Sequence, residues 1–185
     1  MSYCNNQIDG GFTKKACILW MSYININTTY FEWGSGFTTV TADKIGAKVT
    51  SIEGSKDWYN KMIKKNFSNR TNLFYVDIGE TGSFSNPKDP TKSHNYITSI
   101  KDKQDIILVD GRWRVACAIR AFPFISENGR LMIHDFHRKY YHSLLKIYQE
   151  ESKVDSLAVM KPLKNISNLY LEKMFLNFVH NPKRV

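Results

Sequence analysis

The chain has 185 residues, a hydrophobic fraction of 42% and a formal net charge of +9. This length and composition suit one domain over residues 1–185 with a sizeable core and exclude a chain dominated by disorder. The longest apolar segment, 16–23, is much shorter than the roughly 20 residues that span a bilayer and lacks a signal-peptide cleavage pattern. We therefore expect a soluble, cytoplasmic protein without a membrane partner.

The basic charge favours an anionic partner, but lysine and arginine are spread along the chain and no common RNA- or DNA-binding signature accompanies them. A nucleic-acid partner is neither predicted nor excluded. Three cysteines without CxxC spacing, Cys4, Cys17 and Cys117, argue against a disulfide scaffold or a zinc site. Cys117 lies in an apolar stretch and is expected to be a buried, inert thiol.

The first half of the chain alternates segments with strand and helix patterns. The pattern predicts an α/β fold, a three-layer α/β/α sandwich around a Rossmann-like, mostly parallel sheet of about six to seven strands. The expected elements are a helix or helical turn within 12–26, strand 30–33, helix 37–45 ended by Gly46, strand 47–53, helix 56–66 capped by Ser55, and strand 73–77. Trp58, Met62 and Ile63 share helical spacing and are expected to face the sheet as core.

The second half continues the alternation after a long polar stretch, 79–95, which is either a lid or binding loop or a disordered connection. Residues 105–110 form a nearly continuous apolar run, as expected of a central strand buried on both faces. The remaining expected elements are helix 114–125, a turn at 127–129, strand 130–136, helix 137–151, strand 154–160 and a further strand or hairpin partner within 170–178.

Two features of the first strands indicate a nucleotide-like ligand. Gly34-Ser35-Gly36 follows the first strand, where glycines let the backbone approach a ligand and a helix start can present its amides. This pattern is also that of a tight turn without a ligand. Glu53 ends the second strand about 20 residues further on, where Rossmann domains place a carboxylate for ribose hydroxyls.

With these residues the sequence resembles the class I S-adenosylmethionine-dependent methyltransferases over about residues 28–160. Glu32-Trp33-Gly34-Ser35-Gly36 matches the family's first motif, and Glu53, Asp77 and Asp110 match the acids that end its next three strands. The resemblance implies that S-adenosylmethionine is the cofactor and that these positions bind it: Glu32, Gly34, Gly36, Glu53, Asp77 and Asp110. A competing NAD-binding domain usually has a third glycine where this chain has Thr39.

Polar residues follow the fourth and fifth strands, whose carboxyl ends should meet at one cleft. Asp110 can orient a substrate hydroxyl, and His134 or Asp135 can remove its proton, so these three are the expected catalytic residues. Two of them also have a structural interpretation, because Asp135 suits a helix N-cap and His134 a satisfied strand-end histidine. Four cations at the expected mouth are candidates for binding an anionic substrate, or surface residues that only aid solubility: Arg112, Arg114, His137 and Arg138.

The resemblance further implies that acids at these strand ends bind Mg²⁺ in some O-methyltransferases, so Asp110 and Asp135 are conditional metal ligands. The expected function is O-methylation of a small-molecule or carbohydrate (glycan) hydroxyl. Two alternatives stay open: a non-catalytic protein that keeps the fold and binds the cofactor, and a nucleic-acid (RNA) methyltransferase or binding protein. A homodimer is compatible with the sequence, but no interface is indicated.

Overall fold

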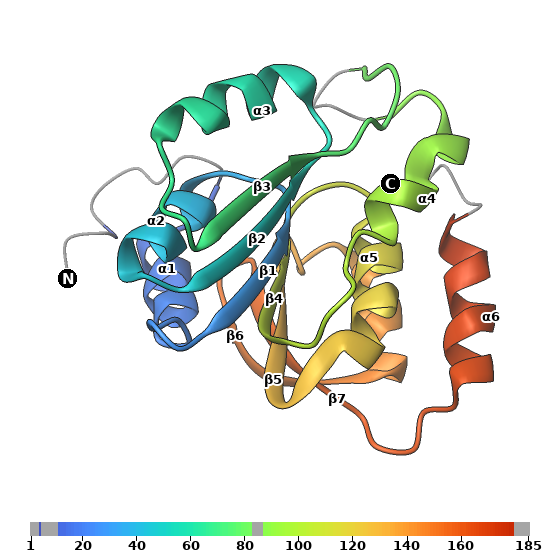
Figure 1. Cartoon of the computed structure of the whole chain (residues 1–185). Helices are drawn as coiled ribbons and strands as arrows, with labels where there is room; N and C mark the ends of the chain where they lie inside the picture. The colour runs from blue at the N-terminus through green and yellow to red at the C-terminus, as the bar shows by residue number, and fades with distance from the viewer. Residues whose placement is uncertain (1–3, 5–10, 83–86, 180–185) are drawn as a thin grey trace.

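The computed structural model describes residue 4, residues 11–82 and residues 87–179, and its centre is one open seven-stranded sheet. The strand order is β3-β2-β1-β4-β5-β7-β6 (Figure 1). Strands β1 to β5 pair in parallel, while β7 runs antiparallel to both β5 and β6. The bounds are β1 Thr29–Trp33, β2 Lys48–Glu53, β3 Thr71–Tyr75, β4 Gln104–Val109, β5 Ile125–Ile133, β6 Tyr148–Val154 and β7 Leu157–Pro162. The expected Rossmann-like, mostly parallel sheet is confirmed.

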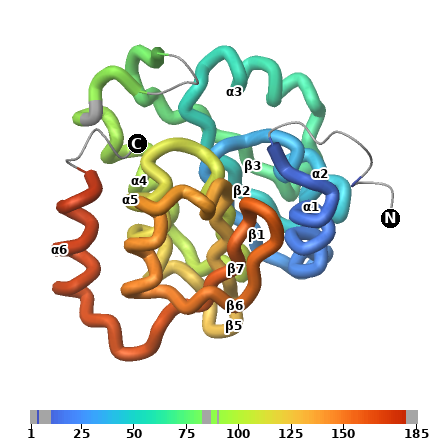
Figure 2. The backbone as a smooth tube through the Cα atoms, turned by 180° about the vertical axis from the view of Figure 1, so that it is seen from behind, coloured from blue at the N-terminus to red at the C-terminus, as the bar shows by residue number. Residues whose placement is uncertain are grey.

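Helices cover both faces of the sheet, as Figures 1 and 2 show. One apolar core lies between the sheet and α1 and α2, and a larger one lies between the sheet and α4, α5 and α6. The α-helices are α1 Lys14–Met21, α2 Phe37–Ile45, α3 Lys56–Met62, α4 Ser93–Ile97, α5 Arg114–Ala121 and α6 Asn168–Val179, and the short 3₁₀ helices are η1 Ile63–Lys65, η3 Pro90–Lys92, η4 Phe122–Phe124 and η5 Lys139–Lys146. Within the described residues, no helix combines the length and the apolar character needed to cross a membrane.

Local signals explain why several helices start and end where they do. Ser55 accepts a hydrogen bond from the Trp58 amide and begins α3, as expected of an N-cap. Gly46 ends α2 with a φ of +89°, the left-handed conformation that glycine adopts without a side-chain clash. Pro123 ends α5, and the chain continues as the short helix η4.

Three elements differ from the sequence-based prediction, and the first is the turn expected at 127–129, which lies within β5 where its pairing with β4 is irregular. The expected helix over 137–151 is wrong, because the segment forms η5 and then the edge strand β6. The charged residues of this exposed edge strand resemble the polar face of a helix, although charged side chains also protect sheet edges from pairing with further strands. The expected strand within 170–178 is wrong as well. It is α6, in which Leu171, Met174 and Phe178 bury one helical stripe.

The structure also tests the predictions made for the cysteines and for part of the long polar stretch. Cys4 and Cys17 form a disulfide, contrary to the expectation from the odd cysteine count, while Cys117 is a buried free thiol as expected. The stretch 79–95 contains an isolated bridge between Thr81 and Pro87, followed by η3 and the start of α4. Residues 83–86 of that stretch lie outside the described residues, so the lid interpretation stays a prediction there.

Hydrogen bonds between strand ends keep the residues that leave the sheet in register. The Gly34 amide donates to the Ile52 carbonyl at 2.8 Å, and the Asp110 amide donates to the Trp33 carbonyl at 3.0 Å. The His134 amide donates to the Val109 carbonyl at 3.2 Å. The ends of β1, β2, β4 and β5 therefore meet at one edge of the sheet, where ligands bind in open α/β folds.

Candidate functional site

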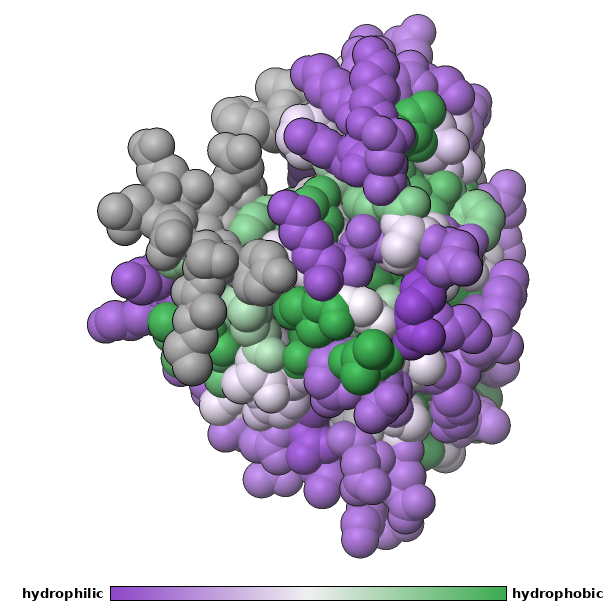
Figure 3. Space-filling model, turned by 60° about the vertical axis from the view of Figure 1, so that its left-hand side comes forward, coloured by the Kyte–Doolittle hydropathy of each residue, from purple (hydrophilic) through white to green (hydrophobic). Residues whose placement is uncertain are grey.

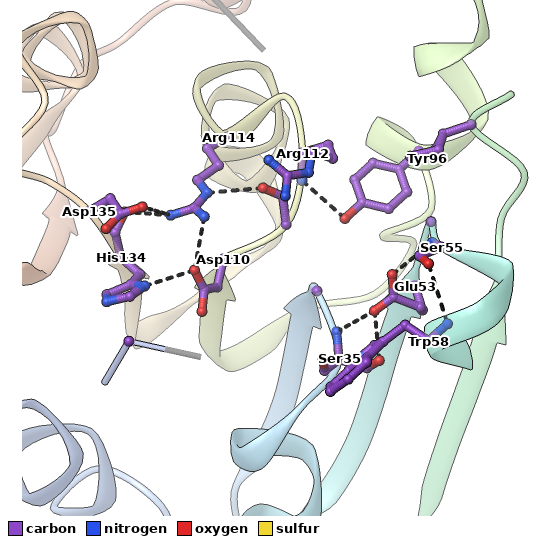
Figure 4. A pocket seen from close by; sticks show the side chains of 15 residues that line it. Ser35, Glu53, Ser55, Trp58, Tyr96, Asp110, Arg112, Arg114, His134 and Asp135 are labelled. Carbon is purple, nitrogen blue, oxygen red and sulfur yellow. Dashed lines mark hydrogen bonds and ion pairs between the residues drawn. The ribbon is translucent and has the colours of Figure 1, made fainter. Parts of the chain in front are cut away.

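A cavity of about 500 Å³ lies at the carboxyl ends of the parallel strands. Its walls come from the residues after β1, β2, β4 and β5, with contributions from α3 and α4 (Figure 4). The lining residues are Gly11, Gly34, Ser35, Glu53, Gly54, Ser55, Trp58, Ile78, Tyr96, Asp110, Gly111, Arg112, Arg114, His134 and Asp135. The strand ends thus bring most of the predicted site residues into one cavity.

The two glycines of the β1–α2 turn have different roles. Gly34 has a φ of +97°, and a Cβ atom there would lie 2.8 Å from the Gly111 nitrogen. The turns after β1 and β4 therefore pack backbone against backbone, which only glycine permits. A Cβ at Gly36 would meet no atom within 4 Å. Gly36 lines a smaller adjoining cavity of about 120 Å³, so it borders open space that a ligand can fill.

Glu53 is held in place by donors from two loops. Its Oε2 accepts hydrogen bonds from the Ser35 amide at 3.1 Å and the Ser35 hydroxyl at 2.7 Å. Its Oε1 accepts from the Ser55 amide at 2.8 Å. A carboxylate offers about four lone-pair sites, so one stays available here, and a rotation of the Ser35 hydroxyl would free a second. Two acceptor sites in a fixed orientation suit the vicinal hydroxyls of a ribose.

Two aromatic residues of the cavity were not among the predicted site residues. Trp58 is 40% exposed and donates from Nε1 to the Ser35 carbonyl at 2.8 Å, so the expectation that it is core is wrong. Ile63 is 46% exposed as well, and only Met62 of that predicted stripe is buried. Tyr96 is 1% exposed, and its hydroxyl accepts from the Arg112 amide at 3.3 Å. Burial raises the pKa of Tyr96 well above its ordinary value.

The opposite wall holds an ionic cluster that joins the ends of β4 and β5. His134 Nδ1 lies 2.9 Å from Asp110 Oδ1, and Figure 4 shows both side chains beside the Arg114 guanidinium. Arg114 contacts Asp110 Oδ1 at 3.1 Å and Asp135 Oδ2 at 3.2 Å. The structure therefore brings the three predicted catalytic residues together, with Arg114 between the two carboxylates.

The second ring nitrogen of His134 has a different environment. Nε2 is buried and has no hydrogen-bond partner among the described residues, although His134 lines the cavity. The ring packs against Phe12, with 4.9 Å between the ring centroids, and a Cβ on Gly11 would lie 3.4 Å from its Cε1. A buried nitrogen without a partner is unfavourable, so Nε2 is a candidate to pair with a ligand hydroxyl or a water.

Four predicted site residues line neither this cavity nor the smaller adjoining one. Glu32 lies within β1, is fully buried and accepts hydrogen bonds from the hydroxyls of Tyr30, Thr38 and Thr39. Burial raises the pKa of the Glu32 carboxyl, and these hydroxyls oppose that shift. The carboxylate therefore anchors the first turn of α2 to β1.

The other three lie nearer the surface. Asp77 accepts from the Gly79 amide at 2.9 Å, which lowers its pKa, and the adjacent Ile78 lines the cavity instead. His137 and Arg138 are exposed, and the Arg138 guanidinium lies 2.8 Å from Asp135 Oδ2.

The arginines that line the cavity are not equivalent as substrate ligands. Arg114 is 8% exposed, and its guanidinium is occupied by protein acceptors, so it does not have the free fork expected of a substrate-binding arginine. Burial lowers the pKa of Arg112, and the neighbouring charge of Arg114 lowers it further. A ligand anion near Arg112 would oppose both effects.

The conditional Mg²⁺ site is not supported. Asp110 and Asp135, its expected ligands, both face the positive guanidinium of Arg114. Among the described residues, no group of three or more histidine, cysteine, aspartate or glutamate side chains is arranged to hold a metal ion. The donor set is thus that of an internal salt-bridge network.

Comparison with solved structures decides which fold this is. A methyltransferase-like protein from Silicibacter pomeroyi superposes with a TM-score of 0.75 at 24% identity, over 95% of this chain and 98% of that one. The chain has the fold of the class I methyltransferases. No protein-family model and no curated protein matches the sequence.

More distant class I methyltransferase structures are similar over most of the chain. A TehB-like SAM-dependent methyltransferase from Corynebacterium glutamicum has a TM-score of 0.54 at 12% identity, covering 86% of this chain and 90% of that one. The tRNA (m1A58) methyltransferase from Aquifex aeolicus has a TM-score of 0.56 at 13% identity, covering 86% and 73%. At such identities the likeness shows the class I methyltransferase fold alone, so the activity has to be argued from the site.

Proposed function

We propose that the protein is an S-adenosylmethionine-dependent methyltransferase that methylates a hydroxyl of a small-molecule or carbohydrate acceptor. The observation that carries the proposal is the cavity that has Glu53 and the Gly34 turn on one side and the Asp110–His134 pair on the other. The class I methyltransferase fold of the chain supports the choice of cofactor.

The residues of the first wall fit the cofactor. Glu53 would accept from the ribose hydroxyls, while Gly36 leaves space beside the turn. Trp58 and Ile78 offer apolar surface for the base. When bound, S-adenosylmethionine supplies an electrophilic methyl group on a sulfonium centre.

The residues of the second wall fit proton removal from an acceptor hydroxyl. With Asp110 accepting from Nδ1–H, His134 is held in the tautomer whose Nε2 carries a lone pair. That nitrogen would take the proton of the acceptor hydroxyl, and the Asp110 carboxylate would stabilise the resulting imidazolium. Asp135 is paired with Arg114 and Arg138, so we assign it a structural part in the site and His134 the role of base.

The acceptor that suits this site best carries an anionic group. Arg112 lines the cavity beside Arg114, and Arg138 lies close to the cavity residue Asp135. A phosphate or carboxylate on the acceptor would interact favourably with these guanidinium groups. We expect Arg112→Gln to raise KM for such an acceptor and to leave KM for an uncharged one unchanged. An equal effect on both acceptors would contradict this part of the proposal.

The first experiment is calorimetric titration with S-adenosylmethionine and S-adenosylhomocysteine, with NAD as the comparison. We expect binding of the first two, weakened at least about tenfold in Glu53→Ala by loss of hydrogen bonds to a charged group. Glu127→Ala, at an exposed glutamate outside the cavity, is the matched control. A folded wild-type protein that binds neither compound would refute the proposal.

Turnover is tested next with a panel of sugars, nucleotide sugars and small phenols, by following release of S-adenosylhomocysteine. We expect His134→Ala to reduce kcat by about 10²–10⁴-fold, the range for loss of a general base, with product binding retained. His94→Ala, at an exposed histidine outside this cavity, should leave kcat unchanged. A kcat in His134→Ala equal to that of the wild type would remove the histidine from the mechanism.

The two alternatives predict other results in the same experiments. A non-catalytic cofactor-binding protein would bind S-adenosylhomocysteine without methylating any acceptor, and substitutions at Asp110 or His134 would alter stability alone. A nucleic-acid enzyme or binding protein would bind RNA or DNA with an affinity that falls steeply with salt. The absence of such binding at physiological salt would remove the second alternative.

A further inference from the structure

Arg114 makes four contacts from one nearly buried side chain. Nε donates to the Gly111 carbonyl and Nη1 to the His134 carbonyl, each at 3.0 Å. Nη1 also lies 3.2 Å from Asp135 Oδ2, and Nη2 lies 3.1 Å from Asp110 Oδ1. The planar fork of a guanidinium can satisfy acceptors in these different directions at once, which a single ammonium cannot. One side chain therefore joins the residues that leave β4 to those that leave β5.

This contact set persists although the local backbone disfavours it. Arg114 is the first residue of α5, and a cation in the first turn opposes the helix dipole. The preceding residue, Trp113, has a φ of +49°, which is costly for a bulky side chain, while Asp135 has a φ of +61°, which aspartate adopts more readily than most residues. The unfavourable dipole and the strained Trp113 backbone lie beside the ion pairs, so the surrounding structure enforces the cluster.

We propose that Arg114 is a positioning residue that takes the place of a divalent cation between Asp110 and Asp135, so that the site works without a metal. A cation bound between these carboxylates would lie beside the guanidinium that contacts both of them, and its charge would be repelled by that guanidinium. By fixing Asp110, Arg114 also fixes the partner of His134 Nδ1. The catalytic part of this inference rests on the proposed function, whereas the cation part does not.

The cation part is tested by titrating Mn²⁺ into the intact protein and following free Mn²⁺ by electron paramagnetic resonance. The wild type should bind none at Asp110 and Asp135. Arg114→Gln removes the cation that lies between the two carboxylates, leaves Arg138 at Asp135, and should gain a site in the millimolar range. Adding Asp135→Asn to that variant should abolish the gained site.

Two further variants serve as controls. Arg114→Lys keeps the positive charge between the carboxylates, so it should gain no Mn²⁺ site. This variant therefore separates the effect of charge from any loss of stability that both substitutions cause. Arg120→Gln, at the other end of α5, changes an arginine whose guanidinium lies 4.7 Å from the Phe124 ring centroid, and it should behave as the wild type. Wild-type Mn²⁺ binding that is lost in Asp135→Asn would overturn the proposal, and so would a folded Arg114→Gln that gains no site.

The positioning part is read from kcat and KM once an acceptor has been found by the screen. EDTA should leave wild-type turnover unchanged. Arg114→Gln should lower kcat about 100-fold, as expected when a catalytic pair is displaced by about an ångström, with little change in KM for the methyl donor. Added guanidinium ion should restore part of the loss, which a purely structural defect would not permit.

A loss of turnover in EDTA that Mg²⁺ restores would overturn the positioning part of the proposal. If the protein binds no S-adenosylhomocysteine, the proposed function fails while the Mn²⁺ titration still decides the role of Arg114.

Discussion

Substitutions of the two glycines in the β1–α2 turn should affect folding and ligand binding differently. We expect Gly34→Ala to destabilise the protein by about 1–3 kcal/mol, because a Cβ would force a strained φ and a backbone clash with Gly111. Gly36→Ala has open space and a φ of 174°, so its melting temperature should stay near that of the wild type.

The same pair predicts opposite ligand effects. In Gly36→Ala the added methyl group enters the space left for the ligand, so S-adenosylhomocysteine affinity should fall although the fold is intact. Thermal unfolding followed by calorimetric titration on both variants tests the prediction. A Gly36→Ala variant that binds as tightly as the wild type would show that the ligand does not approach this glycine.

Glu32 predicts a pH dependence of stability that a glutamine would lack. Burial raises its pKa in the folded protein above the ordinary value of 4.5, against the effect of its hydroxyl donors. The folded state therefore holds the proton more tightly than the unfolded state. Glu32 contributes stability that is fully present below the unfolded pKa and is lost as the pH rises through the folded pKa.

The measurement is urea unfolding of the wild type and Glu32→Gln at several pH values from below 4.5 to neutral. Relative to Glu32→Gln, the wild type should lose free energy of unfolding as the pH rises. Asp43 and Asp105, whose pKa values are lowered by hydrogen bonds that outweigh partial burial, remain in both proteins and cancel in the comparison. A difference between the two proteins that does not change with pH would mean that Glu32 binds its proton equally in both states.

Among the elements, α3 places a fluorescent side chain, Trp58, at the cavity. Trp58 is 40% exposed and lines the cavity, whereas Trp20, Trp33 and Trp113 are at most 2% exposed. Binding of S-adenosylhomocysteine should therefore change the tryptophan fluorescence mainly through Trp58. Trp58→Phe should remove most of that change and weaken binding, with only a small loss of stability. A ligand-induced change of the same size in Trp58→Phe would place the ligand elsewhere.

The parallel strands and the glycine turn were predictable because each leaves a local signal. The apolar run at 105–110 and the glycine that ends α2 give β4 and α2 almost to the residue. The conformation of 137–179 was not predictable in the same way. An edge strand rich in charge resembles a helix face, and only the pairing of β6 with β7 distinguishes them.

The candidate site shows the same division between local signals and long-range contacts. Positions at strand ends could be inferred, since sheet topology brings Glu53, Asp110 and His134 to one edge. The role of Arg114 depends on contacts with residues 20 and 21 positions away, which no local pattern encodes. Trp58 was assigned to the core because helical spacing does not reveal which side of α3 faces the cavity.

For the whole molecule, the net charge of +9 is carried by a surface that is hydrophilic over most of the face in Figure 3, with apolar side chains in small groups. Such a surface keeps a small protein dispersed and does not by itself select a partner. The selectivity for an anionic acceptor that we propose therefore has to come from the cavity, where Arg112 and the Asp110–Arg114–Asp135 cluster lie. Raising the salt concentration should weaken nonspecific binding to polyanions much more than turnover of a small acceptor.

The disulfide between Cys4 and Cys17 connects the start of the chain to α1 and predicts how the whole molecule responds to reduction. Thiol titration in denaturant should find one free thiol, that of Cys117, and three after reduction. A cross-link of this loop size limits the unfolded chain and stabilises the fold by about 3 kcal/mol, so a reductant should lower the melting temperature. Cys4→Ala should melt at the same temperature with or without reductant, while Cys117→Ala should keep the response. Three thiols in the unreduced protein would show that this pair is not oxidised, as expected in a reducing compartment.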